Sequence, residues 1–184
     1  MTVAVCMLRA VNVGGHNKIK MDALRALFES LDFQDARTYI QSGNIVFRTK
    51  ERETRVMQKR IDTAIEKNFG FRCFPVVRTV GELRAALAKN PFAKRPGIEP
   101  NKLLIIFLAG NPAPEAEREI LTIPAEPEEL RMSGRELFIY FPNGMARPKL
   151  SLPRVEKLLA TPGTGRNWNT VRKLVELADE LENC

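Results

Sequence analysis

The order of apolar runs in the first 78 residues restricts this chain to few folds. Two apolar runs, at residues 3–8 and 72–78, are typical of buried strands. Between them, the runs at 36–40 and 45–47 favour strands and are joined by the sequence Gln41-Ser42-Gly43-Asn44. Because Gly and Asn tolerate the positive φ of a tight turn, these two runs predict a hairpin.

Two amphipathic segments complete the pattern. Apolar residues recur at three- and four-residue spacing from Met21 to Leu31 and from Met57 to Ile65, which predicts a helix in each segment. Gly70 is placed to end the second helix. The predicted order is therefore β-α-β-β-α-β, that of a ferredoxin-like unit or α/β plait.

The remaining sequence repeats this order of elements without repeating its residues. Thr79-Val80-Gly81-Glu82 has the spacing of a capping box and predicts a connecting helix. A second series of strands and helices starts at Lys102, includes a hairpin around Ser133-Gly134, and ends in a helix that Asn167 can cap. We therefore expect an α+β protein with two tandem ferredoxin-like units and a C-terminal helix. The expected boundaries are 1–78 for the first unit, 79–101 for the connecting helix and linker, and 102–184 for the second unit with its C-terminal helix.

Composition and cysteine usage indicate the class of protein and its cellular compartment. The chain is 44% hydrophobic and 28% charged, which is ordinary for a globular protein. No apolar run approaches the about 20 residues needed to cross a bilayer, and the N-terminus lacks the basic start of a signal peptide. The three cysteines, Cys6, Cys73 and Cys184, are odd in number and far apart, which argues against a disulfide framework and a zinc site. We expect a cytoplasmic protein with no membrane partner, no metal and no cofactor.

The net charge of +7 is unevenly distributed. Residues 131–173 contain nine Lys or Arg against two Glu, and residues 1–20 contain three Lys or Arg and no acid. This uneven distribution of charge favours an anionic partner such as nucleic acid or a phosphate-bearing ligand. The alternative is a solvated basic face that keeps the protein in solution.

Three stretches of the sequence resemble one bacterial family. They are Leu8-Arg9-Ala10-Val11-Asn12-Val13-Gly14-Gly15, Tyr39-Ile40-Gln41-Ser42-Gly43-Asn44-Ile45-Val46-Phe47 and Arg166-Asn167-Trp168-Asn169-Thr170-Val171. In order and spacing they are similar to the uncharacterised family catalogued as domain of unknown function 1697. The chain differs from the usual pattern at Ala10, His16 and Gly165. The resemblance implies a cytoplasmic protein with two ferredoxin-like units, and it implies no substrate, cofactor or catalytic residue.

The expected topology brings the first two of these stretches together. In a ferredoxin-like sheet with strand order 4-1-3-2, strands one and two run parallel, so their ends reach the same edge. The first helix begins at this edge, where its free N–H groups favour anions. We therefore predict a ligand-binding site there that contains Arg9, Asn12, Asn17, Lys18, Lys20, Gln41, Ser42 and Asn44. The alternative is that these residues only shape the loops through backbone hydrogen bonds.

The third stretch offers a second group of candidate residues. Trp168 is the only tryptophan, and Arg166, Asn167 and Asn169 flank it. One interpretation is a ligand-binding platform on which a base stacks on the indole. The other is that Trp168 begins the apolar stripe of the last helix and anchors that helix to the core.

The sequence contains no recognisable catalytic constellation. His16 is the only histidine, which excludes a His-based triad and a multi-His metal site. No Walker sequence is present, and the three stretches contain no carboxylate. The leading hypothesis is a binding module for nucleic acid or another anionic ligand. The alternatives are an enzyme acting on a small anionic substrate at the same edge, and a protein-interaction or regulatory module.

Overall fold

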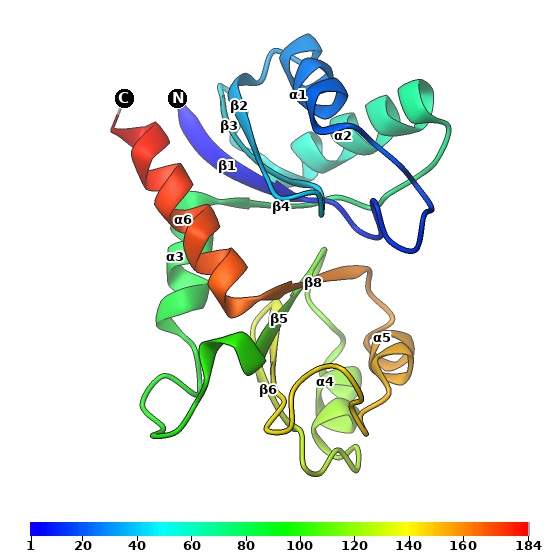
Figure 1. Ribbon diagram of the computed structural model, residues 1–184, viewed down its shortest axis with the longest axis vertical. Helices are drawn as coiled ribbons and strands as arrows, with labels where there is room; N and C mark the ends of the chain where they lie inside the picture. Colours follow the sequence, from blue (N-terminus) through cyan, green and yellow to red (C-terminus); the bar gives the residue numbers. More distant parts are fainter. Residues whose placement is uncertain (184) are drawn as a thin grey trace. The chain divides into compact units, whose positions relative to one another are not determined.

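The computed structural model describes residues 1–183, so Cys184, the last of the three cysteines, lies outside the described residues. The contacts group the chain into two compact units, shown in Figure 1. The first unit comprises residues 1–84 together with the C-terminal residues from Lys173 onward, and the second comprises residues 85–172. Each unit is described by itself.

The first unit is built around a four-stranded antiparallel sheet. Its elements are β1 (Thr2–Met7), α1 (Met21–Ser30), β2 (Gln34–Tyr39), β3 (Asn44–Thr49), α2 (Thr54–Phe69), β4 (Val76–Thr79) and the start of α3 (Val80–Ala88). The strand order is β2-β3-β1-β4, which is the predicted order 4-1-3-2 read from the other side. Because β1 and β2 both pair antiparallel with β3, they run parallel to each other.

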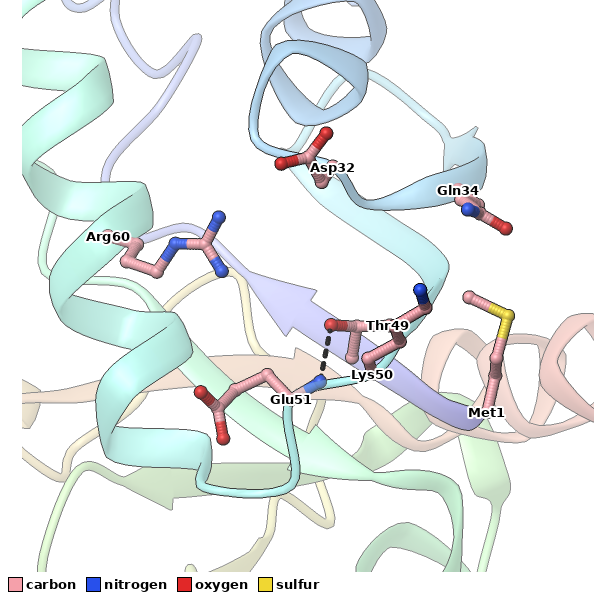
Figure 2. Close-up of a pocket in the computed structure, with 7 residues that line it drawn as sticks. All are labelled: Met1, Asp32, Gln34, Thr49, Lys50, Glu51 and Arg60. Carbon is pink, nitrogen blue, oxygen red and sulfur yellow. Dashed lines mark hydrogen bonds between the residues drawn. The ribbon is translucent and has the colours of Figure 1, made fainter.

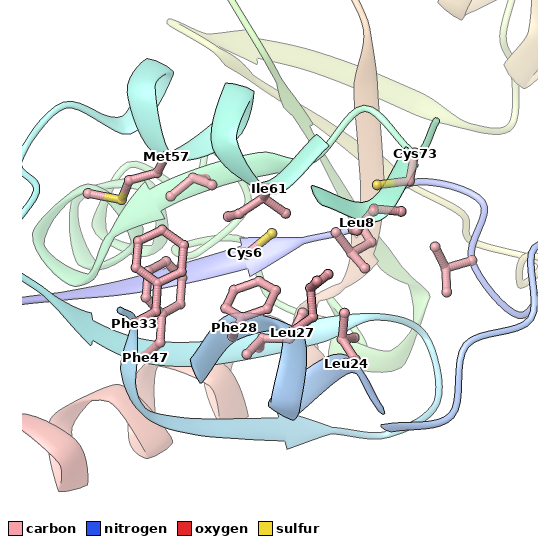
Figure 3. Packing of buried hydrophobic residues seen from close by; sticks show 14 of the residues in the cluster. Cys6, Leu8, Leu24, Leu27, Phe28, Phe33, Phe47, Met57, Ile61 and Cys73 are labelled. Carbon is pink, nitrogen blue, oxygen red and sulfur yellow. The ribbon is translucent and has the colours of Figure 1, made fainter. Parts of the chain in front are cut away.

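Helices α1 and α2 lie on the same side of this sheet, and the main core of the unit lies beneath them (Figure 1). Alternate residues of β1, including Ala4 and Cys6, point into this core because side chains alternate between the two faces of a strand. Phe28 of α1 packs edge-on against Phe47 of β3, with ring centroids 5.2 Å apart (Figure 3). The predicted apolar stripes of both helices are buried, at Leu24 and Phe28 in α1 and at Met57, Ile61 and Ile65 in α2.

Strand β4 is shorter than the predicted strand at 72–78. Phe74 has a positive φ of 44°, far from the extended backbone of a regular strand, and Pro75 has no N–H for a sheet hydrogen bond. The N–H groups of Cys73 and Phe74 instead donate to the Asp62 carboxylate of α2, each over 3.3 Å. The predicted start of this strand was wrong because the apolar run does not reveal the Asp62 partner in α2.

The second unit contains a second four-stranded antiparallel sheet with the order β6-β7-β5-β8. Its elements are η1 (Pro100–Lys102), β5 (Leu103–Leu108), α4 (Pro114–Leu121), β6 (Glu129–Ser133), β7 (Glu136–Tyr140), α5 (Leu152–Leu159), β8 (Gly163–Asn167) and the start of α6 (Trp168–Glu182). Its core combines one face of the sheet with α4 and α5, through residues such as Leu108, Ile120, Ile139 and Val155.

The helix ends confirm the predicted capping residues. Thr79 and Glu82 form a reciprocal capping box, in which the Thr79 N–H donates to Glu82 Oε2 over 2.8 Å and the Glu82 N–H donates to Thr79 Oγ1 over 3.2 Å. Gly70 ends α2 in the left-handed conformation. The N–H of Asn169 donates to Asn167 Oδ1 over 2.9 Å at the start of α6. These caps place the helix boundaries at the residues that the sequence indicated.

The two compact units divide the chain differently from the predicted boundaries, because the C-terminal part of α6 contacts the first unit. The predicted boundaries follow the order of elements rather than contacts, and they stay a prediction. Over residues 1–183, every helix is too short or too polar to cross a membrane.

Candidate functional site

Three segments meet at one end of the first sheet. The N–H of Leu8, just after β1, donates to the carbonyl of Gly43 in the β2–β3 turn over 2.8 Å. The next N–H, of Arg9, donates to the carbonyl of Cys73 over 3.1 Å. We call this end of the sheet the loop edge, and it comprises residues 8–20, 40–44 and 72–75. The predicted neighbours are therefore close in space.

Asn12 fastens the first loop to the turn. Its Nδ2 donates to the Gln41 carbonyl over 2.8 Å and to the Ile19 carbonyl over 3.1 Å. Its Oδ1 accepts the Ile19 N–H over 2.9 Å. All three partners are backbone groups, so the Asn12 amide holds the loop in shape.

The other amide residues of the predicted site also bond within the loops. Asn17 Nδ2 donates to the Ala10 carbonyl over 3.1 Å. Asn44 is fully buried, and its Nδ2 donates to Ser42 Oγ over 2.7 Å and to the Tyr39 carbonyl over 3.2 Å. Asn44 is thus placed to stabilise the turn from beneath rather than to reach solvent.

The two lysines and Gln41 are the predicted residues that face solvent. Lys18, Lys20 and Gln41 are exposed, whereas Arg9 is half-buried. A hollow of about 450 Å³ is lined by Asn12, Gly15, Lys18, Ile19, Lys20 and Gln41. The loop and the turn thus contribute to one concave surface, with two lysines and an amide side chain around it.

Helix α1 begins beside this hollow. Lys20 occupies the N-cap position with extended backbone, and no side chain caps the helix there. The first N–H groups of an α-helix have no partner within the helix and carry a partial positive charge. Asp22 in the first turn forms an ion pair with Arg25 of the same helix. The helix terminus therefore adds to the positive potential that Lys18 and Lys20 create.

The backbone at the loop edge is strained. Eight non-glycine residues with positive φ occur among those that the structure describes, and five of them lie here: Ala10, Asn12, Asn17, Ile40 and Phe74. Positive φ is uncommon outside glycine, and for a β-branched residue such as Ile40 it is an outlier. Strained conformations persist only where surrounding contacts enforce them, and they cluster at functional sites.

Sequence reasoning missed the exposed apolar residues of this edge. Val13, Ile40 and Phe74 are exposed by 63%, 51% and 45%. The Arg72 guanidinium lies over the Phe74 ring at 5.2 Å and pairs with Asp62. Phe74 lies inside an apolar run, which predicts a buried strand residue. Only the proline that follows it indicates that the strand does not include Phe74.

The second predicted group, Arg166 to Asn169, lies in the second unit and is built differently. Arg166 is buried in β8, where its Nη1 donates to Thr164 Oγ1 over 2.7 Å and to the Gly165 carbonyl over 2.8 Å. Asn167 caps α6 through Oδ1 and donates to the Asn101 carbonyl over 2.8 Å. Trp168 is half-buried at the first position of α6, and Asn169 is exposed. Within this group, Arg166 and Asn167 make local structural contacts.

No group of three or more metal-ligating side chains occurs in residues 1–183. The two described cysteines are buried in the core of the first unit (Figure 3). Burial raises the pKa of the Cys73 thiol to about 12, and the nearby Asp62 carboxylate adds to this shift. Such a thiol is protonated at neutral pH and is a poor nucleophile.

These features define an α+β protein with two four-stranded antiparallel sheets and a polar, strained loop edge on the first of them. The chain belongs to the family described as "Protein of unknown function (DUF1697)", whose model matches residues 1–138. The predicted resemblance is therefore confirmed, and two of its three stretches lie within the matched residues. The third stretch, at 166–171, lies beyond them.

The fold is also similar to that of a solved structure, "conserved bacterial protein SP0830 from Streptococcus pneumoniae". The two chains share 22% sequence identity, the TM-score is 0.72, and the similarity covers 96% of this chain and 98% of the other. At this identity the similarity concerns the fold alone. No curated protein matches the sequence.

Proposed function

We propose that this protein is a binding module for nucleic acid or another phosphate-bearing anion, and that its site is the loop edge. The observation that carries the proposal is the hollow of about 450 Å³ in which Lys18, Lys20 and Gln41 surround the fixed Asn12. Pockets of ~300–1,000 Å³ are typical of small-ligand sites. The hollow can therefore take one phosphate-bearing group, either of a free ligand or of a nucleotide within a strand.

Electrostatics favour an anion over other ligands at this edge. Residues 1–20 contain three cations and no acid, and the lining of the hollow contains two of these cations and no carboxylate among the described residues. The open N-terminus of α1 adds its partial charge. Lysine ammonium groups and amide N–H groups together match the acceptor oxygens of phosphate.

The sheet itself supports contact with phosphates rather than with bases. RNA-binding sheets of this topology stack bases on exposed aromatic residues of the central strands. Here Phe47, the one aromatic residue of β3, is fully buried in the core. Binding through the loop edge would therefore depend on charge and would be weakened steeply by salt.

The same edge gives less support to the alternative of an enzyme. The described lining of the hollow offers Lys18 and Lys20 but no carboxylate, histidine or cysteine for acid–base or nucleophilic chemistry. Cations and amides at such a site stabilise a bound anion without further chemistry. We therefore favour binding over catalysis.

Two further expectations belong to this proposal. We interpret each unit as ferredoxin-like, an interpretation supported by the βαββαβ element order and by the matching strand orders of the two sheets. We also expect the protein to act in the cytoplasm, an expectation supported by the buried thiols of Cys6 and Cys73, which form no disulfide and suit a reducing compartment.

The test is a titration of the full-length protein with a fluorescent single-stranded oligonucleotide and, separately, with inorganic phosphate. Each titration is repeated at about 50 and 200 mM salt. Over this range, the affinity of a protein that contacts several phosphates falls strongly. The double variant Lys18→Gln/Lys20→Gln should bind on the order of tenfold more weakly or worse, because charged hydrogen bonds are lost.

The matched control is Lys59→Gln/Lys67→Gln, which removes the same charge from exposed positions on α2. This control should bind almost as tightly as the parent protein. If neither probe binds at low salt, or if both double variants lose affinity equally, the loop edge is not the anion site.

A further inference from the structure

The opposite end of the first sheet carries a second hollow, of about 490 Å³ (Figure 2). It lies where β1 and β2 begin and where β3 ends, so it is separated from the loop edge by the length of the strands. Its lining residues with charged side chains are Asp32, Lys50, Glu51 and Arg60, and the other lining residues are Met1, Gln34 and Thr49. We call it the strand-end hollow.

Arg60 of α2 is held in position at this hollow. Its Nη2 donates to the Leu31 carbonyl over 2.7 Å, and its guanidinium lies 5.0 Å from the centre of the Phe33 ring. Figure 2 shows the guanidinium extending from the helix toward the strand end that carries Thr49. One donor nitrogen is engaged by the protein, and the remaining N–H groups of a guanidinium suit the paired oxygens of a carboxylate.

Glu51 provides a fixed negative charge. Its Oε1 accepts the N–H groups of Arg52 and Glu53 over 2.8 and 2.9 Å, just before α2 begins. Its own N–H donates to Thr49 Oγ1 over 3.0 Å, as drawn in Figure 2. The two backbone donors, helped by Arg60, lower the pKa of this carboxyl, so the group is ionised at neutral pH.

Asp32 and Lys50 complete the charges around the hollow. Asp32 follows α1 in a left-handed conformation with φ of 59°, and both side chains are exposed. The charged side chains of the lining are thus two carboxylates and two cations. A simple anion or cation meets like charges here as well as opposite ones, whereas a ligand with both signs can be complementary at each end.

We propose that the strand-end hollow binds a small zwitterion of the α-amino acid class. Its carboxylate pairs with Arg60, and its ammonium group pairs with Asp32, which lies on the other side of Arg60 from Glu51 in Figure 2. The volume of the hollow leaves room for a side chain of moderate size. This proposal is independent of the anion site at the loop edge, since none of its residues lines that site.

The test is isothermal titration of the full-length protein with L-alanine, L-glutamine and L-methionine. Propionate and ethylamine serve as probes that each keep one of the two charged groups. At least one amino acid should bind, and the single-charge probes should bind at least tenfold more weakly or not at all. Arg60→Gln and Asp32→Asn should each weaken amino acid binding by tenfold or more.

Arg55→Gln, an exposed change on the same helix, is the control and should leave binding unchanged. Arg60→Gln also removes the contacts with Leu31 and Phe33, so the Asp32→Asn variant, at an exposed position, provides the test that does not depend on folding. The proposal is overturned if no amino acid binds at millimolar concentration. It is also overturned if Asp32→Asn binds like the parent, or if propionate binds as tightly as the amino acids.

Discussion

At the scale of single residues, Asn12 shows how a polar side chain in a Gly-rich loop can serve a site without touching a ligand. The sequence left two interpretations of Asn12 open, a ligand contact and a backbone contact that shapes the loop. In the structure both amide atoms bond backbone groups of Ile19 and Gln41. Lys18 and Lys20 remain at the surface of the hollow. Asn12 thus fixes the shape of the loop that carries the two lysines.

Cys73 leads to a prediction about reactivity and pH. Its thiol is buried, and its pKa is raised from the ordinary value of 9.0 to about 12. Iodoacetamide at pH 8 should therefore label Cys73 slowly in the folded protein and quickly after unfolding in guanidinium, because only the thiolate reacts. The measurement is mass spectrometry of a Cys184→Ser variant, in which two cysteines remain.

The same shift has a consequence for stability. Because the pKa is raised in the folded state, the stabilising contribution of the neutral thiol is fully present below about pH 9 and is lost as pH rises toward about 12. A Cys73→Ala variant should lack this part of the alkaline decline in the free energy of unfolding. In the labelling experiment, a rapid reaction of native Cys73 with iodoacetamide at pH 8 would contradict its burial.

At the scale of elements, the β2–β3 turn depends on Gly43. This residue has a φ of 70°, and a Cβ atom added to it would lie 2.8 Å from the Cβ of Leu8. Gly43→Ala therefore combines backbone strain with a clash against a buried strand end. Gly15→Ala is the matched control, since Gly15 has a φ of 81° but no atom within 4 Å of an added Cβ.

We expect Gly15→Ala to cost about 1 kcal/mol of unfolding free energy, from the left-handed conformation alone. Gly43→Ala should cost a further ~1–3 kcal/mol, because the clash forces the turn or Leu8 to move. Urea denaturation followed by circular dichroism measures both values. Equal losses in the two variants would show that the turn adapts to a side chain without disturbing Leu8.

The elements also show what the sequence could predict. Helical spacing and turn residues located α1, α2 and the β2–β3 hairpin, because these depend on local patterns. The 4-1-3-2 strand order then placed the 8–20 loop beside the 40–44 turn. The start of β4 was mispredicted, since the Asp62 carboxylate of α2 accepts the N–H groups of Cys73 and Phe74.

The strand-end hollow was beyond sequence reasoning for the same reason. Asp32, Lys50 and Arg60 are separated along the chain, and each reads as an ordinary surface charge in its own segment. Only the strand register brings the start of β2 beside the end of β3. Element order predicted where loops meet, but not which charged side chains face one another.

At the scale of the whole molecule, the two ends of the chain belong to the same unit. Arg48 of β3 donates through Nε to the Leu181 carbonyl of α6 over 3.2 Å. Arg84 forms ion pairs with Asp179 and Glu182 of the same helix. Leu181 itself is buried, with 1% exposure. The last helical turns are therefore part of the first unit, although the helix starts in the second.

This arrangement predicts that a change near the C-terminus destabilises the N-terminal sheet. Leu181→Ala should lower the free energy of unfolding by ~2–4 kcal/mol, because it leaves a cavity among buried residues. Hydrogen exchange should then accelerate more in β1 and β3 than in β5 and β7, since loss of a contact first affects the cooperative unit that contains it. Asn183→Ala, exposed in the same segment, is the control and should change neither quantity. Faster exchange confined to β5 and β7 would instead show that the C-terminal helix stabilises the second unit, as the sequence-based boundaries imply.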